Sequence, residues 1–181
     1  MRIVLADDEA LVRDGLARLL EDTGIEVVGR CANATALTRA VDSWLPDVAI
    51  IDIRMPPTHT DEGLIAAQEI RRRHPDVGVL VLSHYLESGY AMRLLNETPE
   101  RAGYLLKERV SDVAVLLDTL HRITEGECVV DPTIVARLMA RRRAQGPLDE
   151  LTEREHEVLA LNDSPQHHRR VLAVLTFLRA P

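Results

Sequence analysis

Cysteine and long apolar runs are both scarce in this 181-residue sequence. The two cysteines, Cys31 and Cys128, lie far apart and show neither metal-ligand nor redox spacing, which favours two free thiols in a reducing cytosol over a disulfide. No apolar stretch approaches the ~18 residues that a membrane span requires. A strand pattern begins at Arg2, where a secretory leader would be charged and then apolar. We therefore expect a cytoplasmic protein without a membrane partner.

Positive charge is also in short supply. The formal net charge is −7, which argues against a chain built as a whole to coat nucleic acid or acidic membranes. The charge is unevenly spread, because residues 1–130 hold 14 basic and 22 acidic side chains, whereas residues 131–181 hold 8 and 7. The last part of the chain is thus relatively basic, though not strongly so.

Lysine is the rarest cation in the sequence. Lys107 stands against twenty-one arginines and directly follows the apolar run Gly103–Leu106. A compact ammonium fits beside a small, crowded anionic site, whereas the planar guanidinium of arginine requires more width. The position of Lys107 at the end of an apolar segment therefore suggests a role that arginine fills badly.

Short apolar segments and amphipathic segments alternate regularly from residue 1 to about residue 125. The apolar segments are rich in Val, Ile and Leu, and three are almost continuously apolar, as is typical of parallel strands buried on both faces. The predicted strands are Arg2–Ala6, Glu26–Arg30, Asp47–Ile51, Gly78–Leu82 and Ala102–Leu105. The predicted helices are Glu9–Glu21, Ala34–Ser43, Gly63–Arg73, Glu87–Asn96 and Ser111–Thr124, the last with Ser111 as its cap.

Five such strand–helix units predict an α/β fold. We expect a flavodoxin-like, doubly wound, five-stranded parallel sheet with strand order 2-1-3-4-5 and helices on both faces. Residues 1–125 would form this domain. Residues 126–150 are predicted to be a linker with a helix from Pro132 to about Arg143. Residues 151–181 are predicted to be a short all-α C-terminal remnant, with helices over about 151–161 and 166–179.

Four of the predicted strands end in side chains suited to phosphate or metal chemistry. The carboxyl ends of parallel strands meet at one edge of the sheet, where open α/β proteins keep their binding sites. Three carboxylates gathered there would repel one another and require a cation, and an all-oxygen site of this size suits Mg²⁺. The residues in question are Asp7, Asp8, Asp52, Ser83 and Lys107.

Asp52 is the candidate nucleophile of this group, since aspartate carboxylates form acyl phosphates. Lys107 would balance the charge of the phosphoryl group, and the Ser83 hydroxyl would donate to one of its oxygens. Each residue also has a purely structural alternative. Asp7 or Asp8 could cap the first helix, and Asp52 could stabilise the turn that follows it. Ser83 could bond to the backbone and Lys107 could be a surface cation, but five suitable groups on four strand ends favour the functional interpretation.

The segments LADDE, PDVAIIDIRMPP, VLVLS and GYLLK resemble the receiver domain of bacterial two-component response regulators, over about residues 1–123. The resemblance implies that Asp52 is the phosphoacceptor and that Asp8 and Asp52 hold Mg²⁺ directly. It also implies that Asp7 holds the ion directly or through water and that the backbone carbonyl of Arg54 is a further ligand. One departure from the family pattern is Glu108, which stands where many receivers have proline.

The same resemblance implies a conformational switch. Ser83 would be the switch hydroxyl, Lys107 the phosphate-pairing lysine and Tyr104 the aromatic that moves inward on activation. A phosphoryl group adds roughly −1.5 to −2 charge, so Ser83 would move toward it and Tyr104 would fill the vacated space. The face made by the fourth helix, fifth strand and fifth helix would then repack. The expected partners are a sensor histidine kinase and a second copy of the chain, which the resemblance implies would bind through this face of the receiver. Tyr104 could otherwise be a partly buried strand tyrosine.

The segment LTEREHEVLAL resembles the first helix of LuxR-type helix-turn-helix domains, the effector of NarL-like regulators. Recognition of DNA in this family requires a second helix that enters the major groove. Only nine residues separate Leu161 from Val171, and they include Pro165. We therefore predict an internally shortened effector that lacks the DNA-reading helices, so DNA is a partner expected for the family but doubtful for this chain.

The sequence thus favours a phosphorylation-responsive regulator whose transcriptional output is shortened. One alternative is a working transcription regulator that binds DNA through the remaining C-terminal helices. Another is an enzyme of the haloacid dehalogenase type, which uses the same aspartate nucleophile and Mg²⁺. Arg54 stands where such an enzyme would need a second acid–base aspartate, which argues against it. The catalysis expected is therefore limited to Mg²⁺-dependent self-phosphorylation and dephosphorylation of Asp52.

Overall fold

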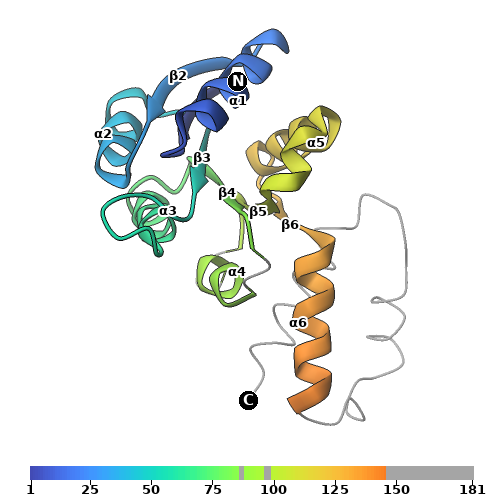
Figure 1. Ribbon diagram of the computed structural model, residues 1–181. Coiled ribbons are helices and arrows are strands. Elements are labelled where there is room, and N and C mark those ends of the chain that lie inside the picture. Colours follow the sequence, from blue (N-terminus) through green and yellow to red (C-terminus); the bar gives the residue numbers. More distant parts are fainter. Residues whose placement is uncertain (86–87, 96–98, 146–181) are drawn as a thin grey trace.

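The computed structural model of the chain describes residues 1–85, 88–95 and 99–145, which form a parallel sheet with helices on both faces (Figure 1). The strands in these residues are β1 (Arg2–Ala6), β2 (Glu26–Cys31), β3 (Val48–Asp52), β4 (Gly78–Ser83), β5 (Ala102–Leu106) and β6 (Cys128–Val130). The helices are α1 (Ala10–Asp22), α2 (Ala34–Trp44), α3 (Glu62–Arg73), α4 (Ser88–Leu95), α5 (Val113–Thr124) and α6 (Pro132–Gln145), with a 3-10 helix η1 (Lys107–Ser111).

The strands pair in the order β2-β1-β3-β4-β5-β6, and every pair is parallel. The predicted α/β fold and the predicted order of the first five strands are therefore confirmed. Strand β6 was missed, because three residues are too short for a periodic pattern. It lies in the segment that the sequence assigns to a linker, and it pairs with β5 from Ala102↔Cys128 to Tyr104↔Val130.

Each face of the sheet carries its own apolar core. Helices α1 and α5 cover one face, and α2, α3, α4 and α6 cover the other (Figure 1). All residues of β1 except the first, and all residues of β3, β4 and β5, are buried. Burial on both faces explains why these strands are almost continuously apolar. Helix α6 is not a separate appendage, because its Ile134 and Leu138 belong to the core on the face that α2, α3 and α4 cover.

Helix ends differ from the predicted ones at one informative place. Asp112, and not Ser111, is the N-cap of α5, and its Oδ1 accepts hydrogen bonds from the backbone nitrogens of Ala114 and Val115. Ser111 instead closes η1, where its hydroxyl donates to the carbonyl of Glu108. Aspartate is at least as good a cap as serine, and because η1 extends to Ser111, the cap of α5 lies one residue later than predicted.

Two of the predicted elements lie outside the described residues: the helices over about 151–161 and 166–179. Among the helices that the structure describes, no helix combines the length and the apolar character that a bilayer crossing demands.

Candidate functional site

The polar ends of four strands lie at one edge of the sheet. Asp52 is the last residue of β3 and Ser83 the last residue of β4, while Asp7 and Lys107 directly follow β1 and β5. Because β1, β3, β4 and β5 are neighbours and parallel, their carboxyl ends point the same way. The sheet therefore collects these side chains at one rim, as the sequence predicts.

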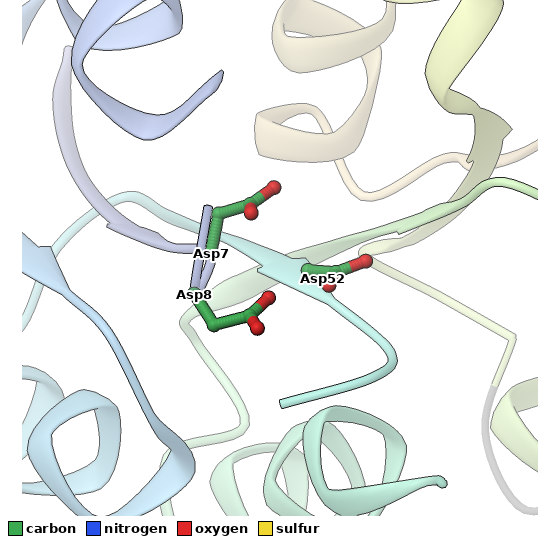
Figure 2. Close-up of side chains that lie close together, drawn as sticks. All are labelled: Asp7, Asp8 and Asp52. Carbon is green, nitrogen blue, oxygen red and sulfur yellow. The ribbon is translucent and has the colours of Figure 1, made fainter. Parts of the chain in front are cut away.

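Asp7, Asp8 and Asp52 form a cluster at this rim (Figure 2). Each offers a carboxylate oxygen, and these three oxygens lie within 4.8 Å of one another. Lys107 Nζ lies 2.7 Å from Asp7 Oδ2 and 3.2 Å from Asp52 Oδ1. The structure thus brings all four charged residues together, and the Lys107 ammonium contacts two of the three carboxylates.

Asp7 does not cap α1, whose N-cap is Glu9, but it uses both of its carboxylate oxygens. Its Oδ1 accepts a hydrogen bond from the backbone nitrogen of Glu9 at 2.9 Å, which orders the turn before α1. Its Oδ2 is the oxygen that bonds to Lys107. With a side chain only 2% exposed, Asp7 is oriented by its own backbone and presents one oxygen to the site.

Asp52 is held in an environment that opposes its ionisation. The pKa of its carboxyl is raised from 3.8 to about 6, first because the group is buried. The Lys107 ammonium lowers this pKa, whereas the charges of Asp7 and Asp8 raise it. Near neutral pH, Asp52 is therefore an ionised but poorly solvated carboxylate, a suitable state for a nucleophile.

Lys107 responds to the same surroundings in the opposite sense. Burial lowers the pKa of its ammonium, but the hydrogen bond to Asp7 and the charge of Asp52 outweigh burial, so that the net shift is upward. Lys107 therefore stays charged. Its single positive charge does not balance three carboxylates, and the residual negative charge on closely spaced oxygens fits a hard divalent cation.

Ser83 and Tyr104 lie near this centre but are differently engaged. The Ser83 hydroxyl donates to the carbonyl of Tyr85 at 2.9 Å and accepts from the Tyr85 nitrogen at 3.1 Å. Tyr104, on β5, is fully buried and belongs to the same core as Val130 and Ile134. In this structure the Ser83 hydroxyl bonds to backbone, as the structural alternative for Ser83 describes. Tyr104 is more deeply buried than the partly buried strand tyrosine of its own structural alternative.

Arg54 follows β3 by two residues. Its guanidinium lies over the ring of Tyr85, 4.8 Å from the ring centroid. This contact joins the loop after β3 to the loop after β4. The role of its backbone carbonyl as a ligand stays a prediction.

Two histidines at the rim were missed by sequence reasoning. His59 Nδ1 lies 3.3 Å from Asp8 Oδ2, and His84 Nε2 lies 3.5 Å from Glu9 Oε1. Both histidines lie in loops that follow strands. Proximity to the strand ends is the signal that could have found them, but loop conformation is not encoded in a periodic pattern.

Gly63, near the start of α3, is a further residue that sequence reasoning missed. A Cβ at this position would lie 1.8 Å from the backbone oxygen of Asp52. The Gly63 nitrogen donates to the carbonyl of Ile53 at 2.8 Å. Helix α3 can therefore pack directly on the phosphoacceptor candidate's own backbone only because residue 63 has no side chain.

The chain belongs to the response regulator receiver domain family, which matches residues 3–119. The family resemblance expected from the sequence is thus confirmed. Receiver domains bind Mg²⁺ through acidic residues and take part in two-component systems with histidine kinases, and the Asp7, Asp8 and Asp52 cluster is consistent with this metal chemistry.

Similar proteins point to the LuxR-type branch of this family. The oxygen regulatory protein NreC of Staphylococcus epidermidis is 31% identical over 172 residues, covering 89% of this chain and 76% of NreC. A two-component response regulator of the LuxR family from Aurantimonas sp. SI85-9A1 superposes with a TM-score of 0.65 at 28% identity, covering 79% of this chain and 97% of that chain. The RcsB response regulator of Salmonella typhimurium, in a structure concerned with DNA interaction, gives a TM-score of 0.63 at 27% identity, covering 88% of this chain and 75% of that chain.

Proposed function

We propose that this chain is a switch that accepts a phosphoryl group on Asp52 and changes conformation in response. The observation that supports this most directly is the position of Lys107 Nζ, 2.7 Å from Asp7 and 3.2 Å from Asp52, within a cluster of three carboxylates. A nucleophile, a set of metal ligands and a cation for the product thus share one rim. Asp7, Asp8, Asp52 and the backbone carbonyl of Arg54 would hold Mg²⁺.

The chemistry is an in-line transfer. One carboxylate oxygen of Asp52 attacks the phosphorus of the donor, the bond from phosphorus to the leaving group breaks, and the leaving group departs with the electron pair. Bound Mg²⁺ would neutralise charge on the transferring oxygens. Lys107 stays beside the acyl phosphate and pairs with one of its oxygens. Beyond this self-phosphorylation and the hydrolysis of the acyl phosphate to aspartate and inorganic phosphate, we propose no enzymatic activity.

The proposed switch uses Ser83 and Tyr104. The new phosphoryl oxygens offer Ser83 a charged acceptor, which is a stronger hydrogen-bond partner than the carbonyl of Tyr85 that it now contacts. Rotation of Ser83 toward that acceptor would break its contacts with Tyr85 and change the packing above Tyr104. Local charge would in this way bias a packed core that has two arrangements.

A sensor histidine kinase is the proposed phosphoryl donor, and a second copy of the chain is the proposed partner for output. The predicted dimer face of α4, β5 and α5 requires a revision. Strand β6 pairs with β5, and helix α6 packs against α4. Part of this face is therefore already covered by β6 and α6 of the same chain. Dimers through that face would require β6 and α6 to move.

DNA binding is the second candidate function. The similarity to RcsB, whose structure concerns DNA interaction, covers 88% of this chain, which favours an output on DNA. The shortened segment between Leu161 and Val171 favours a regulator without DNA-reading helices. Titration with duplex DNA at several salt concentrations separates the two. A working DNA-binding regulator would lose affinity steeply as salt rises, whereas a shortened one would bind weakly at every concentration.

Phosphoryl transfer is tested by incubating the full chain with acetyl phosphate and Mg²⁺ and measuring the intact mass. We expect one phosphoryl group per chain, none after chelation of the metal and none on Asp52→Asn. Asp47→Asn serves as the matched control, because Asp47 contacts the backbone nitrogen of Arg2 just before β3, at the opposite end of that strand from Asp52. Equal labelling of Asp52→Asn and Asp47→Asn would contradict the proposal.

A further inference from the structure

A buried carboxylate outside the phosphoacceptor site joins β6 to α6. Asp131 is 0% exposed and lies directly between the two elements. Its Oδ1 accepts from the backbone nitrogen of Thr133 at 2.8 Å, and its own nitrogen donates to the carbonyl of Tyr104 at 2.8 Å. Asp131 therefore caps α6 and attaches that helix to the strand that carries the switch tyrosine.

The second oxygen of Asp131 contacts a cation on the other side of the rim. Arg109 Nε lies 3.3 Å from Asp131 Oδ2, and the arginine side chain is 50% exposed. Arg109 belongs to η1, the same five-residue 3-10 helix that begins with Lys107. One short helix thus carries two cations, of which Lys107 reaches the phosphoacceptor site and Arg109 reaches the start of α6.

A cavity borders η1 on the side of Glu108 and Arg109. It has a volume of about 540 Å³ and lies at the carboxyl ends of the strands. The residues that line this cavity are His84, Tyr85, Leu106, Glu108, Arg109 and Thr133. Val110 of η1 packs against the core that α1 and α5 cover, and the contacts of Lys107 and Arg109 fix this helix further beside the cavity.

We propose that Asp131 is a positioning residue for Lys107 and that it couples the phosphoacceptor site to β6 and α6. The inference rests on the proposed function of Asp52. When Asp131 holds Arg109, η1 loses freedom, and Lys107 needs less ordering to pair with a phosphoryl group. By thermodynamic linkage, an occupied site that fixes Lys107 must in turn favour the docked state of β6 and α6. The signal then passes to α6 within one chain, before any dimer forms.

Three variants isolate this coupling. Asp131→Asn keeps the cap on α6, since an asparagine oxygen can accept from Thr133, but it removes the charge that attracts Arg109. Arg109→Ala removes the other partner at a half-exposed position that tolerates truncation. Glu127→Gln is the matched control, because it also converts a carboxylate next to β6 to an amide, and its partner at 2.8 Å is Arg122 on α5.

The measurement uses the full chain, Mg²⁺ and beryllofluoride, a tetrahedral fluoride complex that mimics a phosphoryl group on aspartate. Fluorine NMR gives the dissociation constant, and hydrogen exchange reports on residues 128–138. In the wild type, exchange should slow when beryllofluoride binds. Asp131→Asn and Arg109→Ala should each weaken binding about fivefold, the low end of typical coupling between sites. The double variant should be no weaker than either single one, and Glu127→Gln should stay within about twofold.

Several results would overturn the inference while the proposed function stands. These are wild-type binding without slower exchange at residues 128–138, unchanged binding by Asp131→Asn and Arg109→Ala, additive losses in the double variant, or an equal loss in Glu127→Gln. If the wild type fails to bind beryllofluoride at all, the proposed function of Asp52 falls, and this inference falls with it.

Discussion

The rim that holds Asp52 and the β6–α6 unit each contact a cation of η1, but the two contacts differ. Lys107 is 7% exposed and contacts two carboxylates, whereas Arg109 is half exposed and contacts one. A compact ammonium can be shared among ligands, and it can pair with a new anion without a large change of position. A guanidinium fork ties one partner in a fixed direction. Lysine therefore suits the Asp52 site, where a phosphoryl group would be added and removed. Arginine suits the contact with Asp131, whose partner does not change.

The largest expected effect comes from exchanging the two cations. Lys107→Arg should lower the rate of phosphoryl uptake from acetyl phosphate by about 100-fold, because the wider guanidinium cannot enter the space between Asp7 and Asp52. Arg109→Lys keeps its charge at a half-exposed position and should lower the rate by only about threefold. Time courses of intact mass give both rates. Equal rates for the two variants would remove the distinction between the cations.

The charge of Asp52 gives the next effect. Its pKa is about 6 in the folded chain, above the value of an unfolded aspartate, so the folded state favours the protonated group. In metal-free buffer, the stability from this group is fully present below about pH 4 and is lost as pH rises through 6, by at most about 3 kcal/mol. Asp52→Asn stays neutral and lacks this loss.

The free energy of unfolding, measured by urea titration in EDTA from pH 4 to pH 7.5, checks this dependence. We expect Asp52→Asn to be more stable than the wild type at pH 7.5 and to approach it toward pH 4. Saturating Mg²⁺ should reduce the difference at pH 7.5, because bound metal stabilises the wild-type carboxylates. A wild type that gains stability relative to Asp52→Asn as pH rises in EDTA would contradict the assigned pKa.

Close backbone packing also distinguishes the rim from exposed positions of the fold. Gly63→Ala would place a methyl group 1.8 Å from the Asp52 carbonyl oxygen, so we expect a loss of about 1–3 kcal/mol in unfolding free energy and slower labelling of Asp52. Gly15→Ala is the control, since Gly15 is an exposed position in α1 with no neighbouring atom within 4 Å. It should gain up to about 1 kcal/mol. Equal effects of the two substitutions would show that the rim is not tightly packed.

The smallest effect is expected at the β6–α6 attachment. Arg109→Ala leaves the buried carboxylate of Asp131 without its cation, and we expect a loss of about 1 kcal/mol in unfolding free energy. Arg18→Ala, at an exposed position of α1, should change stability by less than about 0.5 kcal/mol. Urea titrations at pH 7.5 measure both. Indistinguishable values would mean that the Arg109–Asp131 contact contributes nothing to stability.

Much of this architecture could be predicted from local patterns. Buried parallel strands such as β3 and β4 are continuous apolar runs, and the charged residues that end them stand out by contrast. Lys107 could be singled out because the chain otherwise uses arginine. The convergence of Asp7, Asp8, Asp52 and Lys107 then follows from parallel pairing alone, and the structure places them together.

The parts that could not be predicted depend on contacts between distant segments. Strand β6 has three residues and becomes a strand only by pairing with β5. The role of Asp131 depends on Arg109, 22 residues away, and that of Gly63 depends on how closely α3 approaches β3. His59 and His84 reach the rim through loops whose conformation has no periodic signature. The order of the first five strands was therefore predictable, whereas strand β6 and the residues that surround the site were not.

Chemical trapping of the phosphorylated residue tests the central claim most directly. Borohydride reduces an acyl phosphate of aspartate to homoserine, and peptide mass spectrometry locates the product. After treatment with acetyl phosphate and Mg²⁺, we expect homoserine at position 52 and at no other aspartate. Trapping at Asp7 or Asp8, or no trapping at all in a chain that carries a phosphoryl group, would contradict the assignment of Asp52 as phosphoacceptor.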